Sequence, residues 1–458
     1  MASFAAYEND SGQNIKSNRL TQFLKEFNLG TILNRSRIRK TQGHSTKDIL
    51  FDLLILPFMG KNLYHDIINN PESPYGKDAI YEFLKCEKFN WRNLLLLISV
   101  KVVSFIDTLS SRDKVLVLDD STLSRSRSKK VELLARVFDY SDEKYLRGYR
   151  FLSLCWSDGT SLLPLDFALL SSRKHRNRYQ DIKKNVDKRS CGYKRRQEAL
   201  SKSTDLVEPM VNRLLSRGIN AKHLLMDSGY AWPKLINKLR KHIHVICMAR
   251  KTCKIHYYYH GRWRSVNDVY RLVKKRPGRA RILSNALVTL KGGEQAKLVF
   301  VRDRRKKDWL PLLTTDTSLE DSEVVRLYGK RWDIEVFFKM SKQHLGLEKG
   351  VQTRDFDSQI AYVTIVMLRA LFLSLEQRRQ EDPRTLGSLF RACCQEMQDL
   401  SFLDSLQRIL RLAVDRLRQS GEFSERVFQR LISAVYGTAI EFLGLDQELY
   451  QRCQRVKL

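Results

Sequence analysis

The stretch KVLVLDDS, from Lys114 to Ser121, decides which kind of fold this chain adopts. Its apolar run has the length of a strand and ends in two aspartates, a pattern typical of a strand buried on both faces of a sheet. A second run, HLLM, is followed by Asp227, and the next stretch, WPKLINKLRKH, predicts a helix with Pro233 in its first turn. A further strand is predicted at HVICMAR. Strands that alternate with helices in this way predict a mixed α/β sheet.

The regions around these runs add a strand pair and several helices. The stretch YRFLSLCWSDGTSLLPLDFALL predicts two strands joined by a turn at residues 157–159. The stretch EALSKSTDLVEPMVNRLLSRG predicts one helix, which Gly218 ends. Upstream, helices are predicted from a capping box between Ser45 and Asp48 and from a cap at Asn90.

Residues 250–308 have a different character, with 18 Lys or Arg residues against four acidic ones. Strand-like runs on either side of Gly292–Gly293 predict a hairpin, so we expect a basic, strand-rich insertion. A capping box from Ser318 to Asp321 then opens a helix. We expect this helix to run to Gly346, about 40 Å at 1.5 Å per residue.

The composition of the chain indicates which kind of partner it binds and in which cellular compartment it works. The net charge of +31, from 82 Lys and Arg against 51 Asp and Glu, implies a polyanionic partner, for which nucleic acid is the first expectation. The eight cysteines form no C-x-x-C pair, so we predict neither a disulfide framework nor a zinc finger, and expect a reducing cytoplasm. The opening MASFAAYENDSGQN has no signal-peptide pattern. The most apolar stretch, QIAYVTIVMLRALFLSL, contains Arg369 and predicts a buried helix rather than a membrane span.

The helix predicted around YGKRWDIEVFFKMSK, residues 328–342, has one narrow polar stripe on an otherwise apolar surface. At about 100° per residue, four polar side chains fall within roughly 60° of one another, and Lys339 falls on the same stripe. A polar face on a buried helix usually serves a site or a salt-bridge network. The four residues are Tyr328, Arg331, Glu335 and Lys342.

Acidic residues from three places can meet at one edge of the predicted sheet. Asp119 and Asp120 end one strand, Asp227 follows another, and Glu335 lies on the helix with the polar stripe. Acids at the ends of adjacent strands can point into a common cleft. Carboxylates suit Mg²⁺ or Mn²⁺, and a pair of such ions catalyses phosphoryl transfer. Strand-end aspartates also cap turns and helices, so the spacing alone leaves a structural role open.

The four polar residues of the stripe match a known signature, Y-(2)-R-(3)-E-(6)-K. In this they resemble the insertion sequence four family of bacterial cut-and-paste DNA transposases. DSGY at Asp227 resembles the second-acid pattern of that family, D-x-G-F/Y, and DDST resembles its first-acid region, where an acid precedes a hydroxyl residue. That order favours Asp120 over Asp119. The resemblance covers roughly residues 113–375.

The resemblance implies an RNase H-like core whose acids Asp120, Asp227 and Glu335 are catalytic and bind two Mg²⁺ (or Mn²⁺) ions. More than a hundred residues separate Asp227 from Glu335, which agrees with an insertion between them. The resemblance also implies DNA phosphate contacts by Arg331 and Lys342 with support from Tyr328, and the helix geometry adds Lys339.

Two tryptophans and one loop are further candidates for DNA contacts. Some members of the family hold a flipped base with tryptophans in the regions of Trp309 and Trp332, although core packing is an equal alternative for Trp332 and a slightly favoured one for Trp309. The run at residues 173–196 has 11 basic residues against two acids, which favours a phosphate-tracking loop over a merely solvated one. Its candidates are Arg173, Lys174, Arg176 and Arg178.

We therefore expect an α/β protein with an RNase H-like mixed-sheet core, interrupted by a basic β-rich insertion and flanked by helical regions. The predicted parts are a helical DNA-binding domain (1–112), the first part of the core (113–248), the insertion (249–315), the second part of the core with the Glu335 helix (316–375) and a helical C-terminal region (376–458).

The expected function is that of a cut-and-paste transposase, which cleaves the ends of its element and joins the 3′-OH ends to target DNA through a hairpin intermediate. Its expected partners are double-stranded DNA, as terminal repeats and as target, and a second copy in the DNA complex, with no membrane. The expected location is the nucleoid in a bacterial cytoplasm. Two alternatives are a decayed protein that only binds element ends and a nuclease of the same fold that does not join strands.

Overall fold

The computed structural model describes residues 19–398, except 41, 72, 141, 304–307 and 380–382, together with a few positions between 426 and 438. These residues form two compact units. We call them the helical unit and the sheet unit. The helical unit contains Met1–Leu33, Arg39–Ile80 and Pro383–Leu458, and the sheet unit contains Asn34–Ile38 and Tyr81–Asp382. Most of the predicted C-terminal region, 376–458, lies outside the described residues.

The helical unit begins as the sequence predicts. The Ser45 hydroxyl accepts a hydrogen bond from the backbone N–H of Lys47 (3.2 Å), which satisfies one free donor at the start of α4. Apolar side chains of this helix are buried with others of the unit, and Phe58 packs on Phe390. The elements at the start of the chain are α2 (Arg19–Glu26), α3 (Leu29–Arg35), α4 (Thr46–Ile55), a π-helix (Tyr64–Ile68) and α5 (Lys77–Lys85), of which α3 and α5 reach into the sheet unit.

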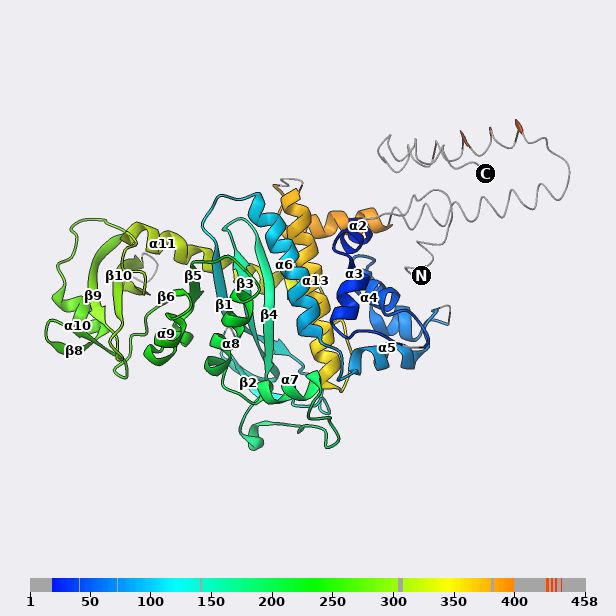
Figure 1. The fold of residues 1–458 in the computed structure, drawn as a ribbon, viewed down its shortest axis with the longest axis horizontal. Coiled ribbons are helices and arrows are strands. Elements are labelled where there is room, and N and C mark those ends of the chain that lie inside the picture. The colour runs from blue at the N-terminus through cyan, green and yellow to red at the C-terminus, as the bar shows by residue number, and fades with distance from the viewer. Residues whose placement is uncertain are drawn as a thin grey trace. The chain divides into compact units, whose positions relative to one another are not determined.

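The sheet unit is built on one mixed sheet, which has 11 strands within the described part of the chain (Figure 1). The strand order is β2-β3-β1-β5-β6-β11-β10-β9-β7-β8, and β4 pairs with β3. The strands of the core are β1 (Val115–Ser124), β2 (Ala135–Asp139), β3 (Lys144–Ser157), β4 (Leu162–Leu170), β5 (His223–Met226) and β6 (His244–Met248).

The arrangement of the core strands confirms the predicted mixed α/β fold. β3 pairs antiparallel with both β1 and β4, whereas β5 pairs parallel with β1 and with β6. The apolar residues 115–118 are fully buried, as expected for a central strand. A mixed sheet of this kind, covered by helices, is consistent with an RNase H-like core.

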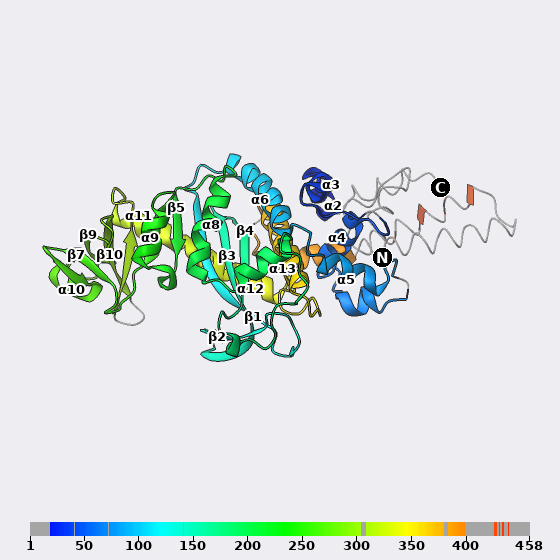
Figure 2. The ribbon, with the colours of Figure 1, turned by 60° about the horizontal axis from the view of Figure 1, so that its bottom comes forward.

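The expected insertion continues the same sheet (Figure 2). β11 pairs antiparallel with β6, and the predicted hairpin at Gly292–Gly293 joins β9 to β10, where both glycines have positive φ. The elements of the insertion are β7 (His256–Tyr259), β8 (Arg262–Ser265), α10 (Val266–Leu272), β9 (Ile282–Thr289), β10 (Gln295–Asp303) and β11 (Asp308–Thr314).

Two long helices, α6 (Trp91–Thr108) and α13 (Phe356–Arg379), pack side by side against β4 (Figure 1). The Asn90 side chain caps α6 by accepting from Asn93 N–H, as predicted. Among the described residues only α13 is long and apolar enough to cross a membrane, but its apolar window is entirely buried within the protein. Arg369 is 0% exposed and donates to the Leu345 carbonyl oxygen, so α13 is the core helix that the sequence predicts.

The helices around the parallel strands differ from the prediction in one place. The single helix expected at 198–218 is broken at residues 200–202. The first part carries its own cap at Ser190 and ends at Ala199, and the second begins at Ser203, so residues 200–202 form a turn between two helices. The helices are α7 (Cys191–Ala199), α8 (Ser203–Leu215) and α9 (Pro233–Leu239).

The long helix predicted from Ser318 to Gly346 is also not one regular helix. It consists of α11 (Asp321–Gly329), a 3-10 turn (Lys330–Trp332) and α12 (Asp333–Gln343). Ser318 bonds to Asp316 instead of forming a capping box. The 3-10 turn tightens the backbone where side chains from β1 and from the β3–β4 turn hold it.

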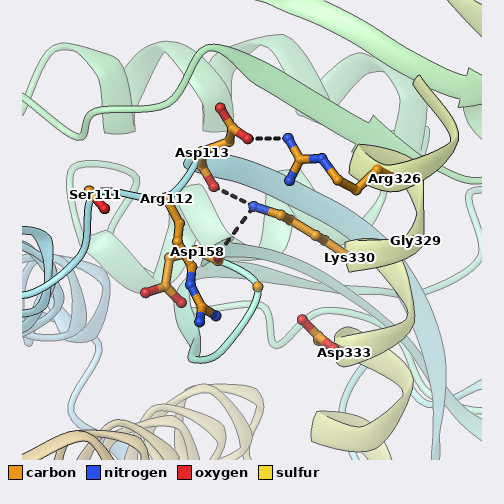
Figure 3. Close-up of a pocket in the computed structure, with 9 residues that line it drawn as sticks. Ser111, Arg112, Asp113, Asp158, Arg326, Gly329, Lys330 and Asp333 are labelled. Carbon is orange, nitrogen blue, oxygen red and sulfur yellow. Dashed lines mark hydrogen bonds and ion pairs between the residues drawn. The ribbon is translucent and has the colours of Figure 1, made fainter. Parts of the chain in front are cut away.

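Figure 3 shows how this turn is held, in a pocket of about 660 Å³ near the amino end of β1. Arg326 forms an ion pair with Asp113, and the Lys330 ammonium group donates to the carbonyl oxygens of Asp113 and Asp158 (Figure 3). Asp333 accepts from the Ser157 hydroxyl (3.3 Å). These contacts fix the start of α12 relative to β1.

Candidate active site

The pairing register of β1 and β5 places two aspartates at the same edge of the sheet. Leu118 is paired with Met226, the last residue of β5, so Asp119 in β1 and Asp227 directly after β5 follow at equivalent positions. The sequence predicts that the strand ends at Asp119 and Asp120, but β1 continues to Ser124. Side chains at equivalent positions leave the sheet on the same side. The Asp227 carboxylate makes no hydrogen bond or ion pair within the described residues, so it is free to bind a ligand.

Arg331 connects Asp119 to the acid of α12. Its guanidinium donates one hydrogen bond to Asp119 Oδ2 (2.8 Å) and another to Glu335 Oε1 (2.8 Å). The guanidinium is largely buried, whereas the Glu335 side chain is 38% exposed. The spacing of four residues between Arg331 and Glu335 brings the two side chains together on one helical face. Arg331 therefore links the acid of β1 to the acid of α12.

Electrostatics at this site favour an added positive charge. Burial, with smaller contributions from the charges of Asp120 and Asp227, raises the pKa of the Asp119 carboxyl to about 7, against the opposing effects of Arg331 and of the hydrogen bond from the Asp120 N–H. The Arg331 pKa is itself raised by Tyr328, Asp119 and Glu335, which outweigh the lowering effect of burial. Burial and the two neighbouring carboxylates thus disfavour the ionised form of Asp119, which a bound cation would stabilise.

Asp120, the first acid favoured by the family pattern, lies elsewhere. Its carboxylate is paired with the Arg150 guanidinium and accepts a hydrogen bond from the Tyr230 hydroxyl (2.9 Å). Successive residues of a strand point to opposite faces, so Asp119 and Asp120 cannot both face Glu335. The structure brings Asp119, rather than Asp120, together with Arg331 and Glu335.

The other residues of the signature surround these acids. The Tyr328 ring lies 5.8 Å from the Arg331 guanidinium, and its buried hydroxyl has no hydrogen-bond partner. Burial raises the pKa of Tyr328, and the charge of Asp227 contributes to the rise. Lys342 lies 3.7 Å from Glu348, and Lys339 is exposed with no acidic partner in the described part of the chain.

The two candidate tryptophans have different surroundings. Trp332 is 61% exposed beside Arg331, so its ring is available to a base. Trp309 stacks on Tyr270 (4.1 Å between ring centroids), and the Lys251 ammonium group lies 4.0 Å from the centre of its ring. Both faces of Trp309 therefore have neighbours within the insertion.

The predicted phosphate-tracking loop follows β4 and carries both free and engaged cations. Arg178 pairs with Asp181 and donates to the carbonyl oxygens of Ser172 and Arg173, so it holds the loop together. The other candidates are exposed, and none has an acidic partner among the described residues. They are Arg173, Lys174 and Arg176.

The donor set fits a divalent cation such as Mg²⁺. Asp119, Asp227 and Glu335 offer only oxygen ligands, and the Asp227 carboxylate is unpartnered. In the described residues no three acidic, His or Cys side chains already stand close enough to hold an ion. Arg331 lies between Asp119 and Glu335, so a bound cation would take over its partners.

One signal in the sequence indicates that Asp119, rather than Asp120, lies opposite Asp227. The runs VLVL and HLLM each contain four residues, and aligning them makes Asp119 the counterpart of Asp227. The roles of Arg150 and Tyr230 had no such signal, because they depend on a hairpin and a turn that only the fold brings together.

Comparison with known protein families gives a match over residues 22–289, more than half of the chain, to the family described as DDE superfamily endonuclease. No curated protein matches the chain. The matched region includes β1 and β5 with Asp119, Asp120 and Asp227, and ends before α12. The family implies a metal-dependent nuclease that acts on DNA, in agreement with the acids at the edge of the sheet. The chain belongs to the DDE superfamily endonucleases.

Proposed function

We propose that this protein is a DNA transposase of the insertion sequence four type, which cleaves the ends of its own element and joins them to target DNA. The observation that carries this proposal is that Arg331 bridges Asp119 and Glu335, while the register of β1 and β5 puts Asp227 opposite Asp119. Three residues of the Y-(2)-R-(3)-E-(6)-K signature, Tyr328, Arg331 and Glu335, are in contact here, and Lys342 lies two turns further along α12, which supports a transposase over a general nuclease.

In the proposed reaction, water attacks a phosphodiester at the element end and leaves a free 3′-OH. The 3′-OH attacks the opposite strand, which releases the flanking DNA and closes a hairpin. Water opens the hairpin, and the restored 3′-OH attacks a target phosphodiester. Each step exchanges one P–O bond for another at a single phosphorus atom.

The residues of the chain have distinct proposed roles in these steps. Asp119, Asp227 and Glu335 would hold two Mg²⁺ or Mn²⁺ ions, which supply charge stabilisation for the entering and leaving oxygens when bound. Arg331 and Lys342 would bind phosphate oxygens beside them, and Tyr328 would orient Arg331 through its ring. Lys339 would extend the phosphate contacts along α12.

The proposed partners follow from the reaction. Element ends and target are both double-stranded DNA, which the net charge of +31 favours. Joining two ends to one target requires two active sites, so we propose a homodimer in the DNA complex. The proposed location is the nucleoid of a bacterium.

A joining assay distinguishes this proposal from its alternatives. Duplexes made from the DNA that flanks the reading frame would be offered with a pre-cut 3′-OH, together with a supercoiled plasmid and Mg²⁺. A transposase covalently joins the labelled duplex to the plasmid. Cleavage without joining would identify a nuclease, and binding without either reaction would identify a decayed binding protein.

A further inference from the structure

A groove of about 1260 Å³ opens at the end of β1, beyond the candidate active site. One wall is the loop that continues β1, residues 124–131, with the sequence SRSRSKKV. The other wall is formed mainly by residues 348–355, which lead from α12 into α13. Residues lining the groove include seven basic side chains and only two acidic ones. The groove is therefore a concave, strongly positive surface.

Buried interactions hold both walls in place. Arg125 donates to Gln359 Oε1 (2.8 Å) and to the Glu348 carbonyl oxygen (2.8 Å), which ties the first wall to the second. Glu132 pairs with the buried Arg196 of α7 and accepts from the N–H of Phe356 at the start of α13. The groove is thus a built feature of the fold, since its shape does not depend on exposed side chains.

The two acids of the groove are engaged, whereas five of its cations are not. Glu348 accepts from the backbone N–H of Ser124 and lies 3.7 Å from Lys342. Asp355 pairs with Lys183 and Arg196. Five exposed cations of the groove have no acidic partner in the described residues, and they are Arg127, Lys129, Lys130, Lys349 and Arg354.

A buried hydroxyl also points to an anionic ligand. Ser358 lies in the first turn of α13 and lines the groove, where it is 1% exposed. Its hydroxyl has no hydrogen-bond partner. The first turn of a 24-residue helix offers a positive dipole, and a hydroxyl beside it can donate to a phosphate oxygen.

The groove begins a short distance along β1 from the acid Asp119. Ser124, the last residue of β1, lines the groove and lies five positions after Asp119. At about 3.3 Å per residue, the groove begins roughly 17 Å from the acids, which is about five base pairs of duplex DNA. A duplex that follows β1 from the acids would therefore place its backbone in the groove.

We propose that this groove binds the phosphate backbone of the duplex DNA whose end lies at Asp119, Asp227 and Glu335. The assignment rests on the proposed function, because the duplex is placed by the active site. The five unpaired cations supply charge to successive phosphates, and Ser358 donates to one of them.

The test measures DNA binding as a function of salt with the full-length protein. Lys129→Gln/Arg354→Gln removes one cation from each wall of the groove. The control, Lys241→Gln/Arg217→Gln, removes one Lys and one Arg, both exposed and without an acidic partner among the described residues, near the amino ends of β5 and β6. Affinity for a fluorescein-labelled mixed-sequence duplex of about 30 base pairs is measured by anisotropy between about 50 and 300 mM KCl.

The expected log–log slope falls by about 1.8 in the groove variant and stays at the wild-type value in the control, since each neutralised phosphate contributes about 0.9. Equal slopes in all three proteins, with unchanged thermal melting, would show that the groove does not bind DNA. The proposed function would not be affected by that result. If the wild-type protein shows no salt-dependent binding to DNA, both the proposed transposase function and the proposed DNA binding by the groove are wrong.

Discussion

Asp119 and Asp120 are neighbours in the sequence, but their side chains have different partners, and this difference gives a direct test. Asp119 shares Arg331 with Glu335, whereas Asp120 pairs with Arg150. We expect Asp119→Asn to reduce single-turnover cleavage about a thousand-fold or more, because a lost ligand costs several kcal/mol of transition-state stabilisation. Asp120→Asn should lower the melting temperature but reduce cleavage by less than about ten-fold.

The other two acids should respond to substitution as Asp119 does. Asp227→Asn and Glu335→Gln should behave like Asp119→Asn, with DNA binding retained. If Asp120→Asn were stable but inactive and Asp119→Asn were active, Asp120 would be the first catalytic acid, as the family pattern favours.

Asp52 in the helical unit gives a prediction about pH. It is 1% exposed, and burial raises its pKa to about 6, although the Tyr75 hydroxyl donates to it (2.6 Å). The unfolded chain loses this proton near pH 4, while the folded chain keeps it until about pH 6. Stability should therefore fall as the pH rises through this window, by roughly 2–3 kcal/mol.

Asp52→Asn keeps the acceptor for Tyr75 but cannot ionise. Compared with the wild type, it should melt at a similar temperature at pH 4 and at a higher temperature at pH 7. If the difference in melting temperature between Asp52→Asn and the wild type were the same at pH 4 and pH 7, ionisation of Asp52 would not destabilise the folded protein. The measurement is a calorimetric or circular-dichroism melt at each pH.

At the scale of elements, the close approach of β1 and β3 supports the candidate site. A Cβ atom on Gly148 of β3 would overlap the carbonyl oxygen of Leu123 in β1. We expect Gly148→Ala to cost about 1–3 kcal/mol or more and to slow cleavage, because the strand that carries Asp119 must shift. Gly329→Ala is the control, since nothing lies near its Cβ and its backbone is helical. That variant should melt at an equal or slightly higher temperature.

The tryptophans test whether a hairpin forms. Base stacking contributes roughly 1–3 kcal/mol, so Trp332→Ala should permit the first nick and slow the next step about five-fold to a hundred-fold, with rescue by Phe. Trp309→Ala should mainly lower the melting temperature, because Tyr270 and Lys251 cover its ring. Labelled nicked, hairpin and opened products are followed on gels. If a stable Trp332→Ala protein formed the hairpin at the wild-type rate, Trp332 would not bind a flipped base.

The sequence predicted the elements that have strong local signals. The strands around Asp119 and Asp227, the hairpin at Gly292–Gly293 and the buried α13 all appear in the structure. The 3-10 turn before α12 was missed because it depends on tertiary partners such as Asp113 and Asp158. The break at residues 200–202 was also missed, and there the Ala199 carbonyl oxygen accepts from the N–H of Ser171, which is far away in the sequence. The preference between Asp119 and Asp120 depends on strand register, which a family pattern does not encode.

At the scale of the whole molecule, the +31 charge predicted a polyanionic partner but not where it binds. The structure gathers part of that charge in the groove beside β1 and part in the loop after β4. Other cations, such as Arg196 and Arg369, are buried in the core and serve the fold. Charge counts alone cannot separate these two classes, because burial is decided by long-range packing.

The proposed dimer leads to a prediction about mixtures of active and inactive chains. If each chain cuts and joins one end, inserting both ends into one target requires two active copies. In a 1:1 mixture of wild type and Asp119→Asn, joining of both ends should fall to about a quarter of the wild-type level if the copies pair at random, while about half of the dimers contain one active copy and give the single-end product. The two products are separated by gel, since one linearises the plasmid and the other leaves a branched circle. If two-end joining fell only to about a half and no single-end product accumulated, one active copy would handle both ends in turn, and the proposed division of labour in the dimer would be wrong.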